Sequence, residues 1–323
     1  MNSSAANSSV QCEARIFVSN TTEARAVTVF LIIMNIITAP VTSLLNGLVI
    51  IAVKRKHRLK TKSSIALACL ATTDCFMGVI GQPMFIALNI VVLQVELSYT
   101  YCLIKQLSMA VLTVLARSTN LHLALMYLDR YIAIKHPYRY TNMVTATRIL
   151  CSSAFVWIVA LLSTVTSFLP KKLLASQLSN VNAVIISSGV AIIIFCQVVL
   201  YYETRRHEKQ IAANQVSEDN KRKFLTEKKA LKLTTTVLFV LVLTYLPLML
   251  VFILYRISFI ASLNAVRIST AIGIFLILLN SLINPVIYCI RTKQFRIAFI
   301  EILFGKSNLF TGRPRRTEMA KSQ

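Results

Sequence analysis

Seven long apolar stretches, separated by short charged segments, dominate the pattern of hydrophobic and polar positions in the chain. Each is long enough for a membrane-spanning helix, which needs about 20 mostly apolar residues. The stretches are 26–53, 63–95, 106–128, 149–170, 173–202, 233–255 and 268–290. Only the second and the third contain a charge, whereas a soluble helical core would alternate an apolar stripe with a charged face. The pattern therefore predicts an all-α membrane protein, a bundle of seven transmembrane helices.

Charge placement predicts the orientation of this bundle. The chain is 56% hydrophobic and 15% charged, and its formal net charge is +23. Of its 35 Lys and Arg residues, 27 lie in the segments 54–62, 130–148, 205–232 and 291–321. By the positive-inside rule these segments face the cytosol, so the N-terminus is expected outside the cell and the C-terminus inside. Because the spans divide the basic clusters among separate loops, we expect anionic membrane lipids rather than a nucleic acid as their partner.

The first segment of the chain carries signals for the cell exterior. Three glycosylation sequons begin at Asn2, Asn7 and Asn20, within the segment that the charge pattern places outside. The first apolar run is too long for the core of a cleavable signal peptide, so we expect it to act as a signal anchor. The sequence therefore predicts an extracellular, glycosylated N-terminal segment.

Two motifs stand at the inner ends of spans. The run Asp129-Arg130-Tyr131, followed by Pro137, closes the third stretch, and the seventh contains Asn284-Pro285-Val286-Ile287-Tyr288. Prolines and amides are costly in lipid, so they are expected where neighbouring helices enclose them or where a helix bends. Together the motifs resemble those of the rhodopsin-like (class A) G-protein-coupled receptors, and the resemblance covers about residues 30–300. It implies a plasma-membrane receptor that binds an extracellular ligand and activates heterotrimeric G proteins by opening its cytosolic face.

The resemblance also predicts a domain order. After the transmembrane domain, the run that begins at Phe295 looks like the short amphipathic eighth helix of the family, lying in the inner interface. Phosphorylation of the tail would allow arrestin to bind. The expected segments are 1–26 for the extracellular N-terminus, 27–290 for the transmembrane domain, 291–304 for the eighth helix and 305–323 for the cytoplasmic tail.

The family pattern assigns roles at the cytosolic end. Glu227 lies 20 residues before Pro247, about 30 Å along a helix, where the family places the latch partner of the motif arginine. An ion pair there would bias the closed state; a solvated pair without regulatory weight is the alternative. The expected coupling and latch residues are Asp129, Arg130, Tyr131, Pro137, Tyr138 and Glu227. The expected activation switch comprises Tyr245, Pro247, Asn284, Pro285 and Tyr288.

One carboxylate lies in the middle of a span. An ionised Asp74 would be costly in lipid, and by resemblance it belongs to the family's sodium pocket. The oxygen ligands expected around it are Thr119, Asn280, Ser281 and Asn284. The alternatives are a polar cluster that only ties helices together, or an Asp74 that stays protonated.

The expected ligand cavity is mostly apolar. Leu112 stands where amine receptors carry an aspartate and Leu278 where opsins carry the retinal lysine, so neither an amine ligand nor retinal is expected. Arg117 is an anomaly in a span, and with the basic outer rim it favours an anionic, lipid-like or peptide ligand. The alternative is that hydroxyls and backbone of the fourth or fifth helix satisfy Arg117. The expected lining is Phe85, Leu112, Thr113, Ala116, Arg117, Tyr245, Leu248, Met249, Phe252 and Ile274.

The cysteine pattern departs from that of most of the family. The second outer loop, about 171–182, has no cysteine, so the family's usual disulfide cannot form. Either Cys12 and Cys102 form a bridge over the pocket, or both stay free thiols. The cysteine-free loop and the proline-less fifth stretch resemble the melanocortin, lipid and adenosine branch of the family.

The sequence fits three other functional classes less well. A transporter or channel is disfavoured because no inverted repeat appears and few charges lie inside the spans. A receptor-like scaffold or heteromer partner that does not signal is favoured by two departures from the family. Tyr245 replaces the family's tryptophan in the sixth span, and the activating tyrosine of the fifth span could be Tyr201 or Tyr202 or be replaced by Gln197. An enzyme is not expected, because the four histidines are isolated and no nucleophile spacing appears.

Overall fold

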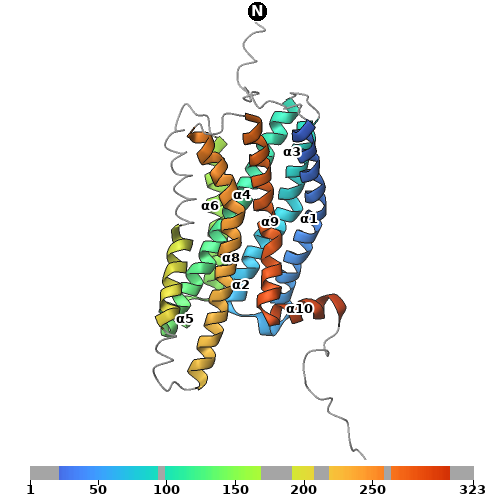
Figure 1. Cartoon of the computed structure of the whole chain (residues 1–323). Helices are drawn as coiled ribbons and strands as arrows, with labels where there is room; N and C mark the ends of the chain where they lie inside the picture. The colour runs from blue at the N-terminus through green and yellow to red at the C-terminus, as the bar shows by residue number, and fades with distance from the viewer. Residues whose placement is uncertain (1–21, 94–98, 169–190, 207–217, 258–262, 306–323) are drawn as a thin grey trace, which may run out of the picture.

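The fold is all-helical over the residues described by the computed structural model, which are 22–93, 99–168, 191–206, 218–257 and 263–305 (Figure 1). The helices are α1 (Thr22–Arg55), η1 (His57–Leu59), α2 (Lys62–Phe76), η2 (Met77–Gly81), α3 (Gln82–Leu93), α4 (Tyr99–Lys135), α5 (Pro137–Met143), α6 (Ala146–Phe168), α8 (Glu218–Arg256), α9 (Leu263–Arg291) and α10 (Lys293–Phe304). Residues 191–206 form a further helix between α6 and α8.

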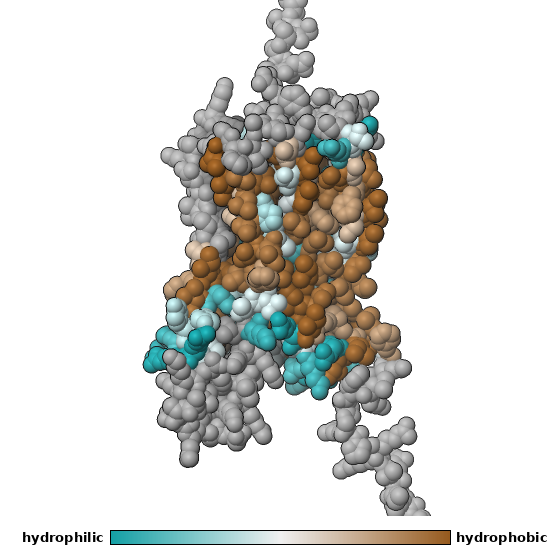
Figure 2. Space-filling model, in the orientation of Figure 1, coloured by the Kyte–Doolittle hydropathy of each residue, from teal (hydrophilic) through white to brown (hydrophobic). Residues whose placement is uncertain are grey.

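Six helices within the described residues are long and apolar enough to cross a membrane. They are α1, the continuous run of α2, η2 and α3, then α4, α6, α8 and α9. Of the predicted fifth span, residues 191–202 are helical, and residues 173–190 lie outside the described part of the chain. Figure 2 shows a brown apolar band along the bundle with teal polar groups gathered below it. The predicted all-α transmembrane bundle is therefore confirmed.

Five buried polar side chains of α1 direct a donor to their own helix. Lipid offers no water, so each such group needs a protein partner. Five side chains each donate to the carbonyl four residues earlier, at 2.8 to 2.9 Å; they are Thr28, Asn35, Thr38, Thr42 and Asn46. Gln82 of α3 then donates to Asn35 Oδ1 at 3.3 Å and to Thr38 Oγ1 at 2.9 Å, which joins the two helices.

The second span contains a π turn, η2, which the sequence analysis did not predict. At this turn Gly78 packs directly against α1. A Cβ atom on Gly78 would lie 2.5 Å from Ser43 Oγ and 2.9 Å from the carbonyl oxygen of Ala39. The missing side chain is therefore what lets α1 and η2 approach so closely.

The predicted amphipathic eighth helix corresponds to α10, which leaves the lower end of the bundle at a steep angle to α9 (Figure 1). Its buried face consists of Phe295, Ala298 and Phe299. Glu301 forms ion pairs with Lys56 Nζ and with Arg58 Nη2, each at 2.8 Å, and these two contacts hold the pKa of its carboxyl below the usual value. Pairs at a wet surface stabilise little, but here they fix α10 beside η1.

We predict that Gly78→Ala destabilises the bundle. The added methyl group would meet a backbone carbonyl that cannot move away, and overpacking of this kind costs about 1–3 kcal/mol. The apparent Tm of the purified protein, followed by a thiol-reactive fluorophore, should fall. Gly47→Ala is the matched control because nothing lies within 4 Å of a Cβ atom there. Equal Tm values for the two variants would contradict the packing argument.

Candidate functional site

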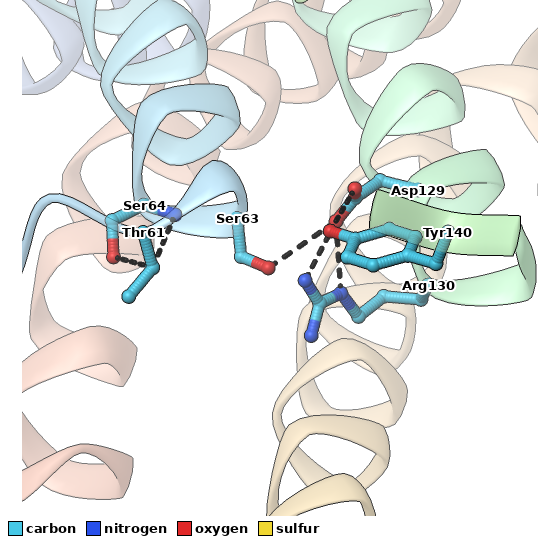
Figure 3. A network of polar contacts seen from close by, with 6 residues as sticks. All are labelled: Thr61, Ser63, Ser64, Asp129, Arg130 and Tyr140. Atoms are coloured by element: carbon cyan, nitrogen blue, oxygen red, sulfur yellow. Dashed lines mark hydrogen bonds and ion pairs between the residues drawn. The ribbon is translucent and has the colours of Figure 1, made fainter. Parts of the chain in front are cut away.

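Asp129 is the centre of a polar network at the end of the bundle that carries α10, hereafter the α10 end (Figure 3). Arg130 donates to Asp129 Oδ2 through Nη2 at 2.6 Å and through Nε at 3.1 Å. Ser63, in the first turn of α2, donates to the same oxygen at 3.2 Å. The α2 helix begins there because Thr61 caps it by accepting from the Ser64 amide at 3.2 Å. The motif arginine is thus held by its neighbouring aspartate, on which a second helix converges.

The short helix α5 supplies the remaining partner of Asp129. Tyr140 donates its hydroxyl to Asp129 Oδ1 at 2.8 Å, and Lys62 lies over the Tyr140 ring at 5.0 Å from its centroid. Burial, and next the charge of Asp129, raises the pKa of Tyr140 to about 12. The phenol therefore stays protonated and remains a donor at neutral pH. Sequence reasoning missed α5 and Tyr140; Pro137 at the first position of the helix was the available signal.

Tyr138 and Glu227 are two further coupling residues that the sequence predicted. Tyr138 is 95% exposed, so its ring is free at the surface of the α10 end. Glu227 lies on α8, but its side chain lies outside the described residues, so the predicted latch to Arg130 stays a prediction. The structure thus gathers Asp129 and Arg130 into one network and leaves Tyr138 apart from it.

Two further contacts tie α4 to its neighbours at the same end. The fully buried Tyr127 donates to the carbonyl oxygen of Thr234 on α8 at 2.6 Å. Lys135 forms an ion pair with Glu203 of the helix over 191–206. Sequence reasoning singled out neither pair, because both join positions far apart in the chain. The α10 end is therefore closed by contacts from α4 to four neighbouring elements, namely α2, α5, α8 and the helix over 191–206.

Asp74 lies in a fully buried polar cluster in the middle of the bundle. Its carboxylate accepts from Ser281 Oγ at 2.7 Å, from Asn284 Nδ2 at 2.8 Å and from Thr119 Oγ1 at 3.4 Å. Asn280 is also buried, and its side-chain oxygen has no hydrogen-bond partner within the described structure. The four predicted neighbours thus lie in the buried core of the bundle, and three of them bond Asp74 directly.

Acceptor oxygens without partners accompany this cluster. Asn46 donates to the Ser281 carbonyl at 2.9 Å, yet its own Oδ1 is buried without a donor, as are the Oδ1 atoms of Asn280 and Asn284. Hard oxygen atoms beside one carboxylate are the ligands that a small cation prefers. The donor set therefore fits the sodium ion that the sequence predicted.

Of the predicted switch residues, Asn284 bonds Asp74, and Tyr288 follows it one turn later on α9, toward α10. Tyr288 is buried, its hydroxyl has no partner in the described structure, and its ring lies 6.1 Å from that of Phe295. Pro285 and Pro247 lie inside α9 and α8. A proline removes a backbone donor and marks a place where a helix bends.

A cavity of about 500 Å³ lies between α4, the helix over 191–206, α8 and α9. Eight of the ten predicted lining residues line it: Leu112, Thr113, Ala116, Arg117, Tyr245, Leu248, Met249 and Ile274. The side chain of Phe252 lies outside the described residues. Phe85 is placed differently from the prediction, because it packs in a core cluster with Leu31 and Phe275.

Arg117 is buried beside this cavity. Its Nη1 donates to Ser163 Oγ at 3.0 Å and to Thr164 Oγ1 at 3.1 Å, both on α6. These hydroxyls in turn donate to the Ala160 carbonyl. These partners agree with the alternative prediction, in which hydroxyls of a neighbouring helix satisfy Arg117. Its Nε, however, has no hydrogen-bond partner in the described structure.

Cys102 is disulfide-bonded, whereas Cys69, Cys75, Cys151, Cys196 and Cys289 are free. The predicted partner Cys12 lies outside the described residues, so the Cys12–Cys102 pairing stays a prediction. The predicted glycosylation sites Asn2, Asn7 and Asn20 and the tail from residue 306 onward also lie outside them.

Comparison with known proteins decides the family. The model of the family described as 7 transmembrane receptor (rhodopsin family) matches residues 45–288, well over half of the 323 residues. The chain belongs to the rhodopsin family of seven-transmembrane receptors. The receptor is therefore a multi-pass membrane protein, and the resemblance predicted from its two motifs is confirmed.

The receptor is also similar to individual members of that family. Adenosine receptor A3 of Bos taurus is 24% identical over 281 residues, which cover 80% of this chain and 84% of the relative. Adenosine receptor A3 of Ovis aries is 25% identical over 280 residues with the same coverage. Histamine H2 receptor of Rattus norvegicus is 30% identical over 116 residues, 36% of this chain and 31% of that receptor. These relatives are receptors rather than enzymes.

We predict that Tyr140→Phe releases α5 from the bundle. The change removes a hydrogen bond to a charged, buried acceptor, which is worth about 1–2 kcal/mol. Hydrogen exchange of the backbone amides in 137–143 should then accelerate about fivefold to thirtyfold. Tyr138→Phe, at a fully exposed ring on the same helix, should leave these rates unchanged. Parent-like exchange in Tyr140→Phe would show that Asp129 does not anchor α5.

Proposed function

We propose that this receptor binds an extracellular ligand and activates heterotrimeric G proteins at the α10 end, which faces the cytosol of the cell. The observation that carries the proposal is the arrangement around Asp129 and Arg130. The family motif lies at one end of the bundle, and its arginine, Arg130, donates to the neighbouring Asp129 instead of extending toward a G protein. This arrangement is expected for a closed, inactive state.

Opening would separate α8 from α4. Pro247 interrupts the hydrogen bonding of α8, so the helix can pivot there. The Tyr127–Thr234 contact opposes this motion because Thr234 lies before Pro247, on the part of α8 that would move away from α4. A ligand that binds the open state better than the closed state would shift the equilibrium by that difference in affinity.

The side chains that line the cavity limit the chemical class of ligand that can bind there. The described lining contains a guanidinium and no carboxylate, which does not suit the ammonium group of histamine, named for one relative. The same lining is almost entirely aliphatic, with few polar partners for adenosine, named for the others. We therefore favour an anionic, lipid-like ligand over a peptide, which would bring many amides that need hydrogen bonds.

A receptor-like scaffold that never activates a G protein is the second candidate. The observation behind it is Tyr245, whose ring lines the cavity one turn from Leu241 and Leu248 instead of the family's tryptophan. G-protein dissociation sensors, expressed with the receptor in the absence and presence of ligand, separate the two. A receptor that reaches the plasma membrane and activates no G-protein subtype would support the scaffold.

We predict that Tyr127→Phe raises basal signalling. The variant keeps the buried ring but loses the hydrogen bond to α8, worth about 1 kcal/mol, which would shift the closed state toward the open one about fivefold. The measurement is ligand-free dissociation of G-protein sensors at matched surface expression. Tyr255→Phe, near the other end of α8, is the control and should match the parent. If Tyr127→Phe also matches the parent, the contact does not hold the α10 end closed.

We also propose a sodium ion beside Asp74, held by the oxygen atoms of Thr119, Asn280, Ser281 and Asn284. The unpartnered amide oxygens and the single carboxylate support it. The ion would add contacts between α2, α4 and α9 and so stabilise the closed arrangement of the three helices.

The sodium proposal predicts a selective stabilisation. Replacing choline chloride by sodium chloride at equal ionic strength should raise the apparent Tm of the purified receptor. The gain should correspond to about 1 kcal/mol when sodium is several times its Kd. Asp74→Asn keeps the side-chain shape without the charge and should abolish the difference. A parent receptor that is insensitive to the exchange would leave only a polar cluster that ties helices together.

A further inference from the structure

Among the described residues that line the cavity, Arg117 is the one cation, and most of the others are apolar. We propose that the cavity binds a long-chain carboxylic acid, whose carboxylate pairs with Arg117 and whose hydrocarbon chain fills the apolar space. This inference names the ligand class for the proposed receptor function and rests on it. The contacts of Arg117, the composition of the cavity and its position on the bundle support it separately.

Hydrogen bonding of Arg117 is incomplete. A guanidinium has five N–H donors in a rigid fork. Two neutral hydroxyls, those of Ser163 and Thr164, engage Nη1, while the buried Nε has no partner and Nη2 bonds no described residue. Only 8% of the residue is exposed. The α6 hydroxyls thus fix the orientation of the fork and leave one edge of it unused.

The charge of Arg117 is likewise not compensated. No carboxylate of a described residue lies within ion-pair distance of its nitrogen atoms. A buried charge without a counter-ion is strongly unfavourable, whereas a guanidinium edge binds a planar carboxylate through two parallel hydrogen bonds. A ligand carboxylate would therefore supply both the missing charge and the missing acceptors.

The rest of the cavity selects a single acid with a long apolar chain. Apart from Arg117, the polar groups on its described lining are Thr113, Asn120 and the Tyr245 hydroxyl. The remaining lining side chains are aliphatic or methionine, and none is a second cation. A volume of about 500 Å³ is typical of small-molecule sites. A polyanion would lack counter-charges here, and a small acid without a chain would leave most of the apolar space unfilled.

The position of the cavity suits a ligand dissolved in the membrane. Ile194 on one side and Val242, Leu246 and Met249 on α8 line the cavity, and each is also about half exposed. These half-exposed side chains are all apolar and belong to two helices of the bundle that lipid would surround. A hydrocarbon chain can therefore reach the cavity between the two helices without crossing water.

Direct binding tests the inference without any G protein. The full-length receptor in phosphatidylcholine nanodiscs is titrated with radiolabelled oleic acid, with methyl oleate as the competitor that lacks the charge. We expect saturable binding at one oleate per receptor and at least about tenfold weaker competition by the ester. Absence of saturable oleate binding, or equal affinity for acid and ester, would overturn the proposal.

Three variants locate the site. Arg117→Gln keeps a hydrogen-bonding amide but removes the charge, and it should weaken oleate binding at least about tenfold and abolish the preference for acid over ester. Ala116→Phe should abolish binding by filling the cavity beside an intact Arg117. Lys60→Gln removes a positive charge at an exposed position at the α10 end and should bind like the parent. A folded Arg117→Gln receptor that retains parent affinity would refute the assignment; should that variant not fold, the acid–ester comparison on the parent decides.

Signalling by the same receptor separates this inference from the proposed function. Arg117-dependent oleate binding without activation of any G-protein sensor would retain the ligand class and overturn the function. Basal G-protein activation by a receptor that binds no oleate would retain the function and overturn the ligand class.

Discussion

The need to satisfy every polar group without water is the constraint on which the rest of this structure depends. In the hydrocarbon region an unpaired donor or acceptor costs several kcal/mol, so each must find a partner inside the bundle. The hydroxyls and amides of α1 bond their own helix, and Gln82 bonds across to Asn35 and Thr38. Polar side chains therefore join helices here in addition to the apolar contacts.

The two charged residues in the spans meet that constraint in opposite ways. Asp74 receives three donors from α4 and α9, and its surroundings then contain an excess of acceptor oxygens. Arg117 has two hydroxyl acceptors and an unused nitrogen. The first environment suits a cation and the second an anion. Both lie on the same helix bundle, one in its closed centre and one at the wall of a cavity.

Much of the fold could be predicted from composition alone, because a lipid solvent imposes a simple rule on helix length and charge. The neighbours of Asp74 could also be predicted, since Ser281 and Asn284 recur at helical spacing in a motif with a known position. Tyr140 and Ser63 could not, because their contacts with Asp129 depend on how α5 and the first turn of α2 pack against α4. The hydroxyl partners of Arg117 were foreseen only as one of two alternatives, since sequence does not say which neighbouring helix a buried side chain faces.

Phe85 was predicted to line the cavity, and its different position follows from the π turn at Met77–Gly81. A π turn accommodates one residue more than an α turn, and each helical residue advances by about 100° around the axis. Every side chain of α3 is therefore rotated by about that angle relative to an uninterrupted helix, which turns Gln82 toward α1 and Phe85 into the core. The extra residue of the π turn shifts the helical position of every later residue in this span by one. A substitution transferred from a relative whose helix lacks the extra residue would emerge on a different face of this one.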